Sequence, residues 1–62
     1  MSKYNVGDTV RLREECREIN GAGNVENEFV VVWVRNNKED EDATLYGLSG
    51  AIDLKVFQSE VL

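Results

Sequence analysis

The chain has 62 residues, of which 42% are hydrophobic and 31% charged. Because so short a chain supplies only one small core, we expect a single domain over residues 1–62. Its longest apolar run, Phe29–Val34, is far shorter than the roughly 20 residues that cross a bilayer, and no signal-peptide pattern opens the chain, which predicts a cytoplasmic protein without membrane association. One cysteine and no histidine argue against an internal disulfide, a zinc site and histidine-dependent catalysis, so we expect no enzyme, cofactor, metal or catalytic residue.

The first predicted strand lies within residues 6–13, and Gly7-Asp8 supplies the turn that leads into it. Apolar and polar residues alternate there with a period of two, which is typical of a half-buried strand. The apolar positions are Val6, Val10 and Leu12.

A long irregular loop with one helical turn is expected next. Leu12, Cys16 and Ile19 have helical spacing, and Gly21 would close such a turn, although Asn20-Gly21 also favours a tight turn without a helix. A flexible break at Gly21–Asn24 follows.

The strongest strand signal is Phe29–Val34, which consists of β-branched and aromatic residues and is apolar at both parities. Such a strand must be covered on both faces. One alternating set would fill the interior, while the other meets a loop, a terminus or another molecule. The two sets are Phe29, Val31 and Trp33, or Val30, Val32 and Val34.

The remaining chain predicts two further strands and a terminal turn. Asn36-Asn37 and the acidic run form a hairpin loop before a strand at Ala43–Leu48, whose Gly47 indicates a bulge or sharp bend. A two-residue turn at Ser49-Gly50 leads to a fourth strand, and residues 57–62 suit a short helical turn that caps one end of a barrel. In the fourth strand, Ile52, Leu54 and Val56 alternate with Asp53 and Lys55.

These four to five short strands predict an all-β fold, a small antiparallel barrel with a long loop after strand one and a short C-terminal helical turn. The segment Gly7–Leu12 resembles the G-D-x-V-x-L opening of SH3-like barrels, including KOW-type ribosomal modules and short uncharacterised bacterial and phage proteins. Those small proteins continue with a Val-rich strand carrying Trp, here Phe29–Val34, and a terminal Phe-x-x-x-x-Leu turn, here Phe57–Leu62. The resemblance implies an SH3-like barrel of bacterial or phage origin, a fold that hosts peptide binders, nucleic-acid binders and scaffolds.

Charge is concentrated in the middle of this chain of net charge −5, where four carboxylates follow one another at Glu39, Asp40, Glu41 and Asp42. We expect a solvated loop or a partner-facing acidic patch, since the run lacks the spacing of a calcium loop. The basic residues near the N-terminus alternate with glutamates, so direct nucleic-acid binding is not expected. These basic residues are Lys3, Arg11, Arg13 and Arg17.

Cys16 is predicted to have a structural role. The glutamates around it would raise the pKa of its thiol, and no histidine is present to activate it. We expect Cys16 to pack as a small apolar residue beside Leu12 and Ile19.

The candidate site is a protein-binding surface with Phe29, Trp33 and Tyr46 as anchors and the four carboxylates as an electrostatic rim. Core packing is the alternative role for Trp33 and Tyr46. We therefore expect a non-enzymatic interaction module that binds another protein or itself. If one face of Phe29–Val34 is left open, one route to self-association is an edge strand from this segment that pairs across a two-fold axis. The alternatives are an acidic inhibitor that occupies the nucleic-acid or nucleotide groove of a host enzyme, and a structural subunit of a larger assembly.

Overall fold

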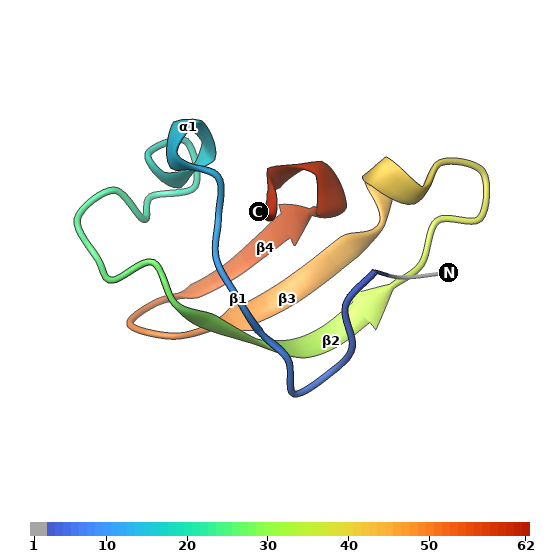
Figure 1. Cartoon of the computed structure of the whole chain (residues 1–62), viewed down its shortest axis with the longest axis horizontal. Helices are drawn as coiled ribbons and strands as arrows, with labels where there is room; N and C mark the ends of the chain where they lie inside the picture. Colours follow the sequence, from blue (N-terminus) through green and yellow to red (C-terminus); the bar gives the residue numbers. More distant parts are fainter. Residues whose placement is uncertain (1–2) are drawn as a thin grey trace.

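The computed structural model describes residues 3–62. Strands and single helical turns follow one another along this part of the chain (Figure 1). They are β1 (Thr9–Val10), α1 (Glu14–Arg17), β2 (Phe29–Arg35), η1 (Glu41–Ala43), β3 (Leu45–Ser49), β4 (Asp53–Phe57) and η2 (Gln58–Glu60). Within residues 3–62, no helix has the length and hydropathy needed to cross a bilayer.

The strands form one antiparallel sheet in the order β1-β2-β3-β4, so each strand pairs with its neighbours in sequence. The sheet is curled into a half-barrel (Figure 1). The predicted all-β antiparallel fold is confirmed, as are the long loop after the first strand and the helical turn near the C-terminal end. The architecture is consistent with a small SH3-like barrel.

After β1 the chain leaves β2 and pairs with the C-terminal residues. Leu12 forms an isolated antiparallel bridge with Val61, and the backbone N–H of Leu62 donates to the carbonyl oxygen of Arg11 at 2.8 Å. η2 makes the turn that returns the chain from β4 to this position. The C-terminal residues therefore close one side of the half-barrel.

A β-bulge interrupts the pairing of β2 with β3. Val31 pairs with Leu48 and Trp33 pairs with Gly47, which leaves Val32 as an extra residue in the β2–β3 register. A bulge of this kind bends the strand and changes the phase of its side chains. The sequence predicted a bulge or bend at Gly47, and the irregularity lies in the strand that faces it.

The bulge decides which residues of β2 reach the core. Phe29 and Val31 are buried before it, and Val34 packs against the core after it. Neither alternating set predicted from the sequence fills the interior by itself, because the extra residue shifts the alternation by one. The buried core consists of Val10, Leu12, Ala22, Phe29, Val31, Tyr46, Leu48, Val56 and Val61.

The loop between β1 and β2 contains the predicted helical turn, but its apolar face differs from the prediction. Ile19 is 83% exposed, so the expected cluster of Leu12, Cys16 and Ile19 is wrong. Ala22 is buried instead, and Gly21, at φ +74°, provides the left-handed backbone that turns the chain toward it.

Asn27 attaches this loop to the barrel, and Arg17 forms a bond within the loop. The side-chain amide of Asn27 forms two hydrogen bonds with the backbone of Leu12. Its Oδ1 accepts from the Leu12 N–H, and its Nδ2 donates to the Leu12 carbonyl oxygen, each at 2.8 Å. Asn27 thus acts as a neighbouring strand would. Arg17 Nη2 donates to the carbonyl oxygen of Val25 at 2.6 Å.

Two strand boundaries differ from the prediction. Val6 is 64% exposed because it lies in a turn before β1, where Gly7 has φ +97° and Asp8 N–H donates to Asn5 O at 3.0 Å. The strand predicted within residues 6–13 is therefore too long at both ends, since β1 covers only Thr9–Val10 and Leu12 forms an isolated bridge. The Ser49-Gly50 turn is also wrong, because Ser49 belongs to β3 and residues 50–52 connect it to β4.

A buried hydrogen-bond group holds the N-terminal segment on the barrel. The hydroxyl of Tyr46, which is fully buried, donates to Gln58 Oε1 at 2.6 Å and accepts from the backbone N–H groups of Lys3 and Tyr4 at 3.0 and 3.2 Å. The ring of Tyr4 packs edge-to-face on that of Tyr46, with 5.7 Å between centroids. Side chains rather than strand pairing therefore fix residues 3 and 4.

Candidate protein-binding face

The strand register identifies the side chains on the face of the sheet that points away from the core. Tyr46, Leu48 and Val56 point inward, so the residues between them on β3 and β4 point outward. We call this side the outer face. Three cross-strand rows follow it from β2 to β4: Val30, Ser49 and Asp53; Trp33, Gly47 and Lys55; and Arg35, Leu45 and Phe57.

Gly47 determines how Trp33 lies on the outer face. A Cβ atom at Gly47 would overlap the indole ring, with Nε1 and Cε2 of Trp33 as the nearest atoms. The ring therefore lies across the backbone of β3, in space that only glycine leaves free. Trp33 remains 40% exposed, so the chain's single tryptophan is neither a core residue nor a freely extended side chain.

Large apolar side chains on three adjacent strands make up the outer patch, which we define as Val30, Trp33, Leu45 and Phe57. Leu45 and Phe57 are direct cross-strand neighbours, and Phe57 is 50% exposed. Val30 is 41% exposed, and the bulge residue Val32 is exposed beside the patch. These apolar side chains share one face of three adjacent strands, which distinguishes them from apolar residues scattered over the surface.

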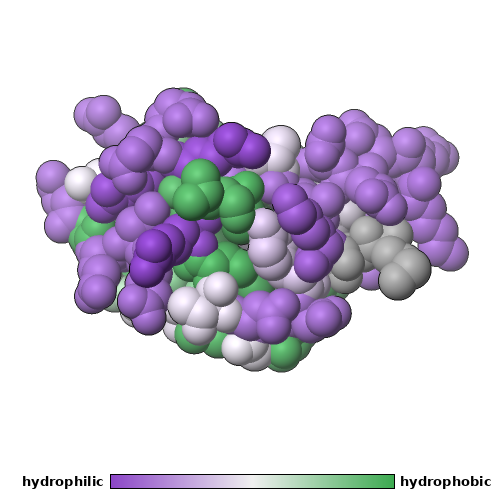
Figure 2. Space-filling model, in the orientation of Figure 1, coloured by the Kyte–Doolittle hydropathy of each residue, from purple (hydrophilic) through white to green (hydrophobic). Residues whose placement is uncertain are grey.

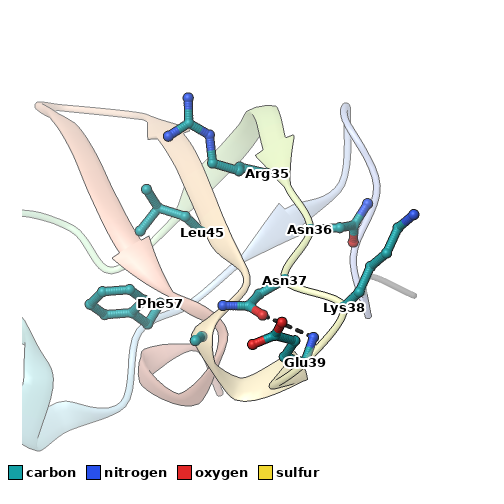
Figure 3. Close-up of a pocket in the computed structure, with 8 residues that line it drawn as sticks. Arg35, Asn36, Asn37, Lys38, Glu39, Leu45 and Phe57 are labelled. Carbon is teal, nitrogen blue, oxygen red and sulfur yellow. Dashed lines mark hydrogen bonds between the residues drawn. The ribbon is translucent and has the colours of Figure 1, made fainter.

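A shallow cavity of about 420 Å³ lies at one end of the outer patch. Figure 3 shows Leu45 and Phe57 extending to the same side of the sheet, with Asn37 and Glu39 on the adjoining hairpin loop. Leu45 and Phe57 supply an apolar wall, and the hairpin supplies a polar one. The lining residues are Arg35, Asn36, Asn37, Lys38, Glu39, Ala43, Leu45 and Phe57.

The acidic run lies in the hairpin between β2 and β3, beside this cavity. Asn37 Oδ1 accepts the backbone N–H groups of Glu39 and Asp40 at 3.0 and 3.1 Å, and Asp40 Oδ1 accepts that of Asp42 at 3.1 Å. These bonds give the loop a defined shape that ends in η1. All four acidic side chains, Glu41 included, are exposed to solvent.

The structure separates the three aromatic residues proposed as anchors. Phe29 and Tyr46 are 1% and 0% exposed, so they form the core beneath the sheet, while Trp33 lies on the outer face. Phe57 is the anchor-type residue that the sequence reasoning missed. It continues the outward positions of Asp53 and Lys55, and that alternation was the available signal.

Cys16 is half-buried in α1. Burial raises the pKa of its thiol, and the carboxylates of Glu60 and Glu15 raise it further, whereas Arg13 lowers it. The protonated thiol is therefore favoured in this position, which is unfavourable for a nucleophile.

Most of the basic residues near the N-terminus are engaged with other parts of the chain. Arg17 pairs with Glu14 at 3.0 Å, Arg13 Nε donates to the carbonyl oxygen of Ser59 at 3.1 Å, and the ammonium of Lys3 lies over the ring of Tyr4. Within residues 3–62, no three acidic or cysteine side chains gather closely enough to hold a metal ion.

Figure 2 shows a largely hydrophilic surface, with hydrophobic residues mainly in its middle and along its lower border and smaller areas at the left. Comparison with models of protein families, with curated proteins and with solved structures finds no match to this chain. The likeness to SH3-like barrels therefore rests on the strand topology, and the function must be argued from the surface itself.

Proposed function

We propose that this chain is a non-enzymatic interaction module of the cytoplasm that binds a protein partner through the outer patch. The partner segment inserts an apolar side chain beside Leu45 and Phe57 and carries basic residues next to it. The observation that supports this proposal is the set of apolar side chains on the outer face, of which Val30, Trp33 and Phe57 are exposed and Leu45 is half-buried beside Phe57.

The energetic argument concerns Trp33 and Phe57. Aromatic side chains dominate the binding energy of many protein interfaces because they remove a large apolar area from water with little loss of side-chain freedom. Trp33 is already oriented by Gly47, so its ordering cost is met in the free protein. Leu45 adds apolar area beside Phe57, its direct cross-strand neighbour.

The electrostatic argument concerns the acidic hairpin. Glu39 lines the same cavity as Phe57, and Asp40 and Asp42 follow it on the exposed loop. In a chain of net charge −5, this arrangement attracts a basic segment and repels nucleic acid. The carboxylates are exposed, so they accelerate association more than they add affinity.

A selection from a random peptide library on the purified chain tests the proposal. Phe57→Ser removes the most exposed member of the outer patch, and Ile19→Ser is the matched control, because Ile19 is an equally apolar exposed residue on the loop near α1. We expect the enriched peptides to combine aromatic or aliphatic residues with Lys or Arg. Their affinity should fall at least about tenfold, or 1.4 kcal/mol, in Phe57→Ser and stay unchanged in Ile19→Ser.

Salt dependence separates this proposal from a purely electrostatic inhibitor. Binding anchored by apolar contacts should persist from about 0.05 to 0.5 M salt, where exposed charge pairs are heavily screened. Reversal of Glu39 and Asp42 to lysine should slow association and leave the dissociation rate nearly unchanged. Equal binding by Phe57→Ser and parent, or binding lost entirely in high salt, would refute the proposal.

A further inference from the structure

β4 is an edge strand of the sheet. It lies at the opposite edge from the bridge between Leu12 and Val61 that closes the half-barrel. The strand order ends at β4, and the C-terminal residues pair with the chain beyond β1 rather than with β4. Leu54 packs against the core but is only half-buried, and the same holds for Ile52. Among residues 3–62, no strand lies beyond β4.

The hydrogen bonds that flank β4 show which of its backbone groups face outward. Gln58 N–H donates to Thr44 O at 2.8 Å, and Gly50 N–H donates to Ile52 O at 3.1 Å. In an antiparallel ladder every second residue bonds a given neighbour, so the even-numbered residues of β4 face β3. The odd-numbered Asp53 and Lys55 present their N–H and C=O groups at the open edge.

The third odd-numbered residue is already satisfied on its donor side. Phe57 N–H donates to Glu60 Oε1 at 2.9 Å, within the turn that forms η2. The open edge of β4 is therefore a short stretch centred on Leu54, with Asp53 and Lys55 on either side of it.

We propose that the β4 edge pairs antiparallel with the β4 edge of a second copy of this chain, across a two-fold axis at Leu54. Asp53 then lies opposite Lys55 of the second copy, and Lys55 lies opposite its Asp53. Each such pair exchanges both backbone hydrogen bonds, and its side chains have opposite charge. The pairing joins the two sheets into one continuous sheet and brings the two Leu54 side chains together on the inner face.

The charges select this register over its neighbours. With the axis at residue 53, the Asp53 residues of the two copies lie opposite each other. With the axis at residue 55, the two Lys55 residues do. Both alignments are disfavoured, because like charges directly opposite each other are destabilising. A lysine on an edge strand usually prevents pairing. Here the aspartate two residues before it provides the complementary charge, so the same lysine favours one alignment.

The pairing uses the backbone edge of β4 and not the apolar side chains of the outer patch, so the inference does not rest on the proposed function. Asp53 and Lys55 share the outer face with the patch, in the rows of Val30 and Trp33. The pairing also changes the strand involved in self-association. For self-association the sequence pointed to Phe29–Val34 as an edge strand, but in the order β1-β2-β3-β4 the first residues of this strand, Phe29 and Val30, pair with β1. The two outer patches of the proposed pair lie on the same side of the joined sheet.

Sedimentation equilibrium of the full chain from about 10 μM to about 1 mM, with reductant present so that Cys16 cannot form a cross-link, tests the pairing. We expect a reversible dimer. Lys55→Asp and Asp53→Lys should each weaken it at least about tenfold, and the double exchange Asp53→Lys with Lys55→Asp should restore it to within about threefold. Circular dichroism of each variant confirms that the fold is retained.

A monomer at every concentration would overturn the inference, and so would a dimer that survives both single reversals. Phe57→Ser keeps the two proposals apart, because it should remove peptide binding and leave the dimer intact. Backbone amide exchange at residues 53 and 55 gives an independent readout, with protection that increases with protein concentration if these groups pair.

Discussion

The buried hydroxyl of Tyr46 gives a quantitative prediction about stability. Tyr46→Phe keeps the ring and removes a hydroxyl that takes part in three hydrogen bonds, two with the backbone of Lys3 and Tyr4 and one with Gln58. The 0% exposure of Tyr46 means that water cannot replace the lost group without rearrangement. The ring packing is preserved, so the effect isolates the polar contribution.

The expected cost is about 2 kcal/mol, because each bond contributes roughly 1 kcal/mol and the N–H groups of Lys3 and Tyr4 are partly accessible to water. For a chain of this size, that corresponds to a fall of roughly 10 °C in Tm. Urea unfolding followed by the fluorescence of Trp33 gives the free energy, and circular dichroism gives Tm.

Two further variants test the reasoning. Tyr4→Phe removes an exposed bond to Leu62 O and should cost less than about 1 kcal/mol. Adding Gln58→Leu to Tyr46→Phe should recover part of the loss, since both buried partners are then apolar. A change below about 0.5 kcal/mol in Tyr46→Phe would show that this group does not hold the N-terminal segment.

Three other variants and conditions address separate features. Gly47→Ala should displace the indole of Trp33, shift its fluorescence to longer wavelength and cost about 1–3 kcal/mol in urea unfolding; an unchanged spectrum would contradict the proposed close packing. Asn27→Ala removes two bonds to the barrel backbone and should cost about 1–2 kcal/mol, whereas the exposed Asn24→Ala should be neutral. Because the pKa of the Cys16 thiol is raised in the folded chain, the unfolded chain ionises first as pH rises. The free energy of unfolding should therefore fall as the pH rises above the ordinary thiol pKa. Iodoacetamide should also react more slowly with the folded than with the urea-unfolded protein near about pH 8.5. Faster reaction of the folded chain would refute this reasoning.

Much of the sheet was predictable because local patterns specify it. Alternation in β4 and the β-branched content of β2 identify these strands, and Gly47 indicates the irregular pairing between β2 and β3. The faces of β2 were not predictable. Every residue of Phe29–Val34 is apolar, so no polar position shows where the extra residue changes the alternation.

The candidate site was predicted only where local composition identifies its residues. Trp33 and the acidic hairpin were identified, since both stand out in composition. Phe29 and Tyr46 lie in the core instead, and their burial depends on contacts distant in sequence, such as that of Tyr46 with Gln58. The sequence does not single out Phe57, because the pattern of residues 57–62 predicts a helical turn, whereas this residue ends β4 and precedes η2.

The bulge at Val32 also makes β2 tolerant of a change in chain length. Elsewhere in a sheet, deleting one residue moves every following side chain to the opposite face. Deleting Val32 instead makes Val31 and Trp33 adjacent, as their partners Leu48 and Gly47 already are, so each remaining side chain of β2 keeps its face. Sequence relatives that are one residue shorter are expected to place the gap here, with both the core and the outer patch preserved.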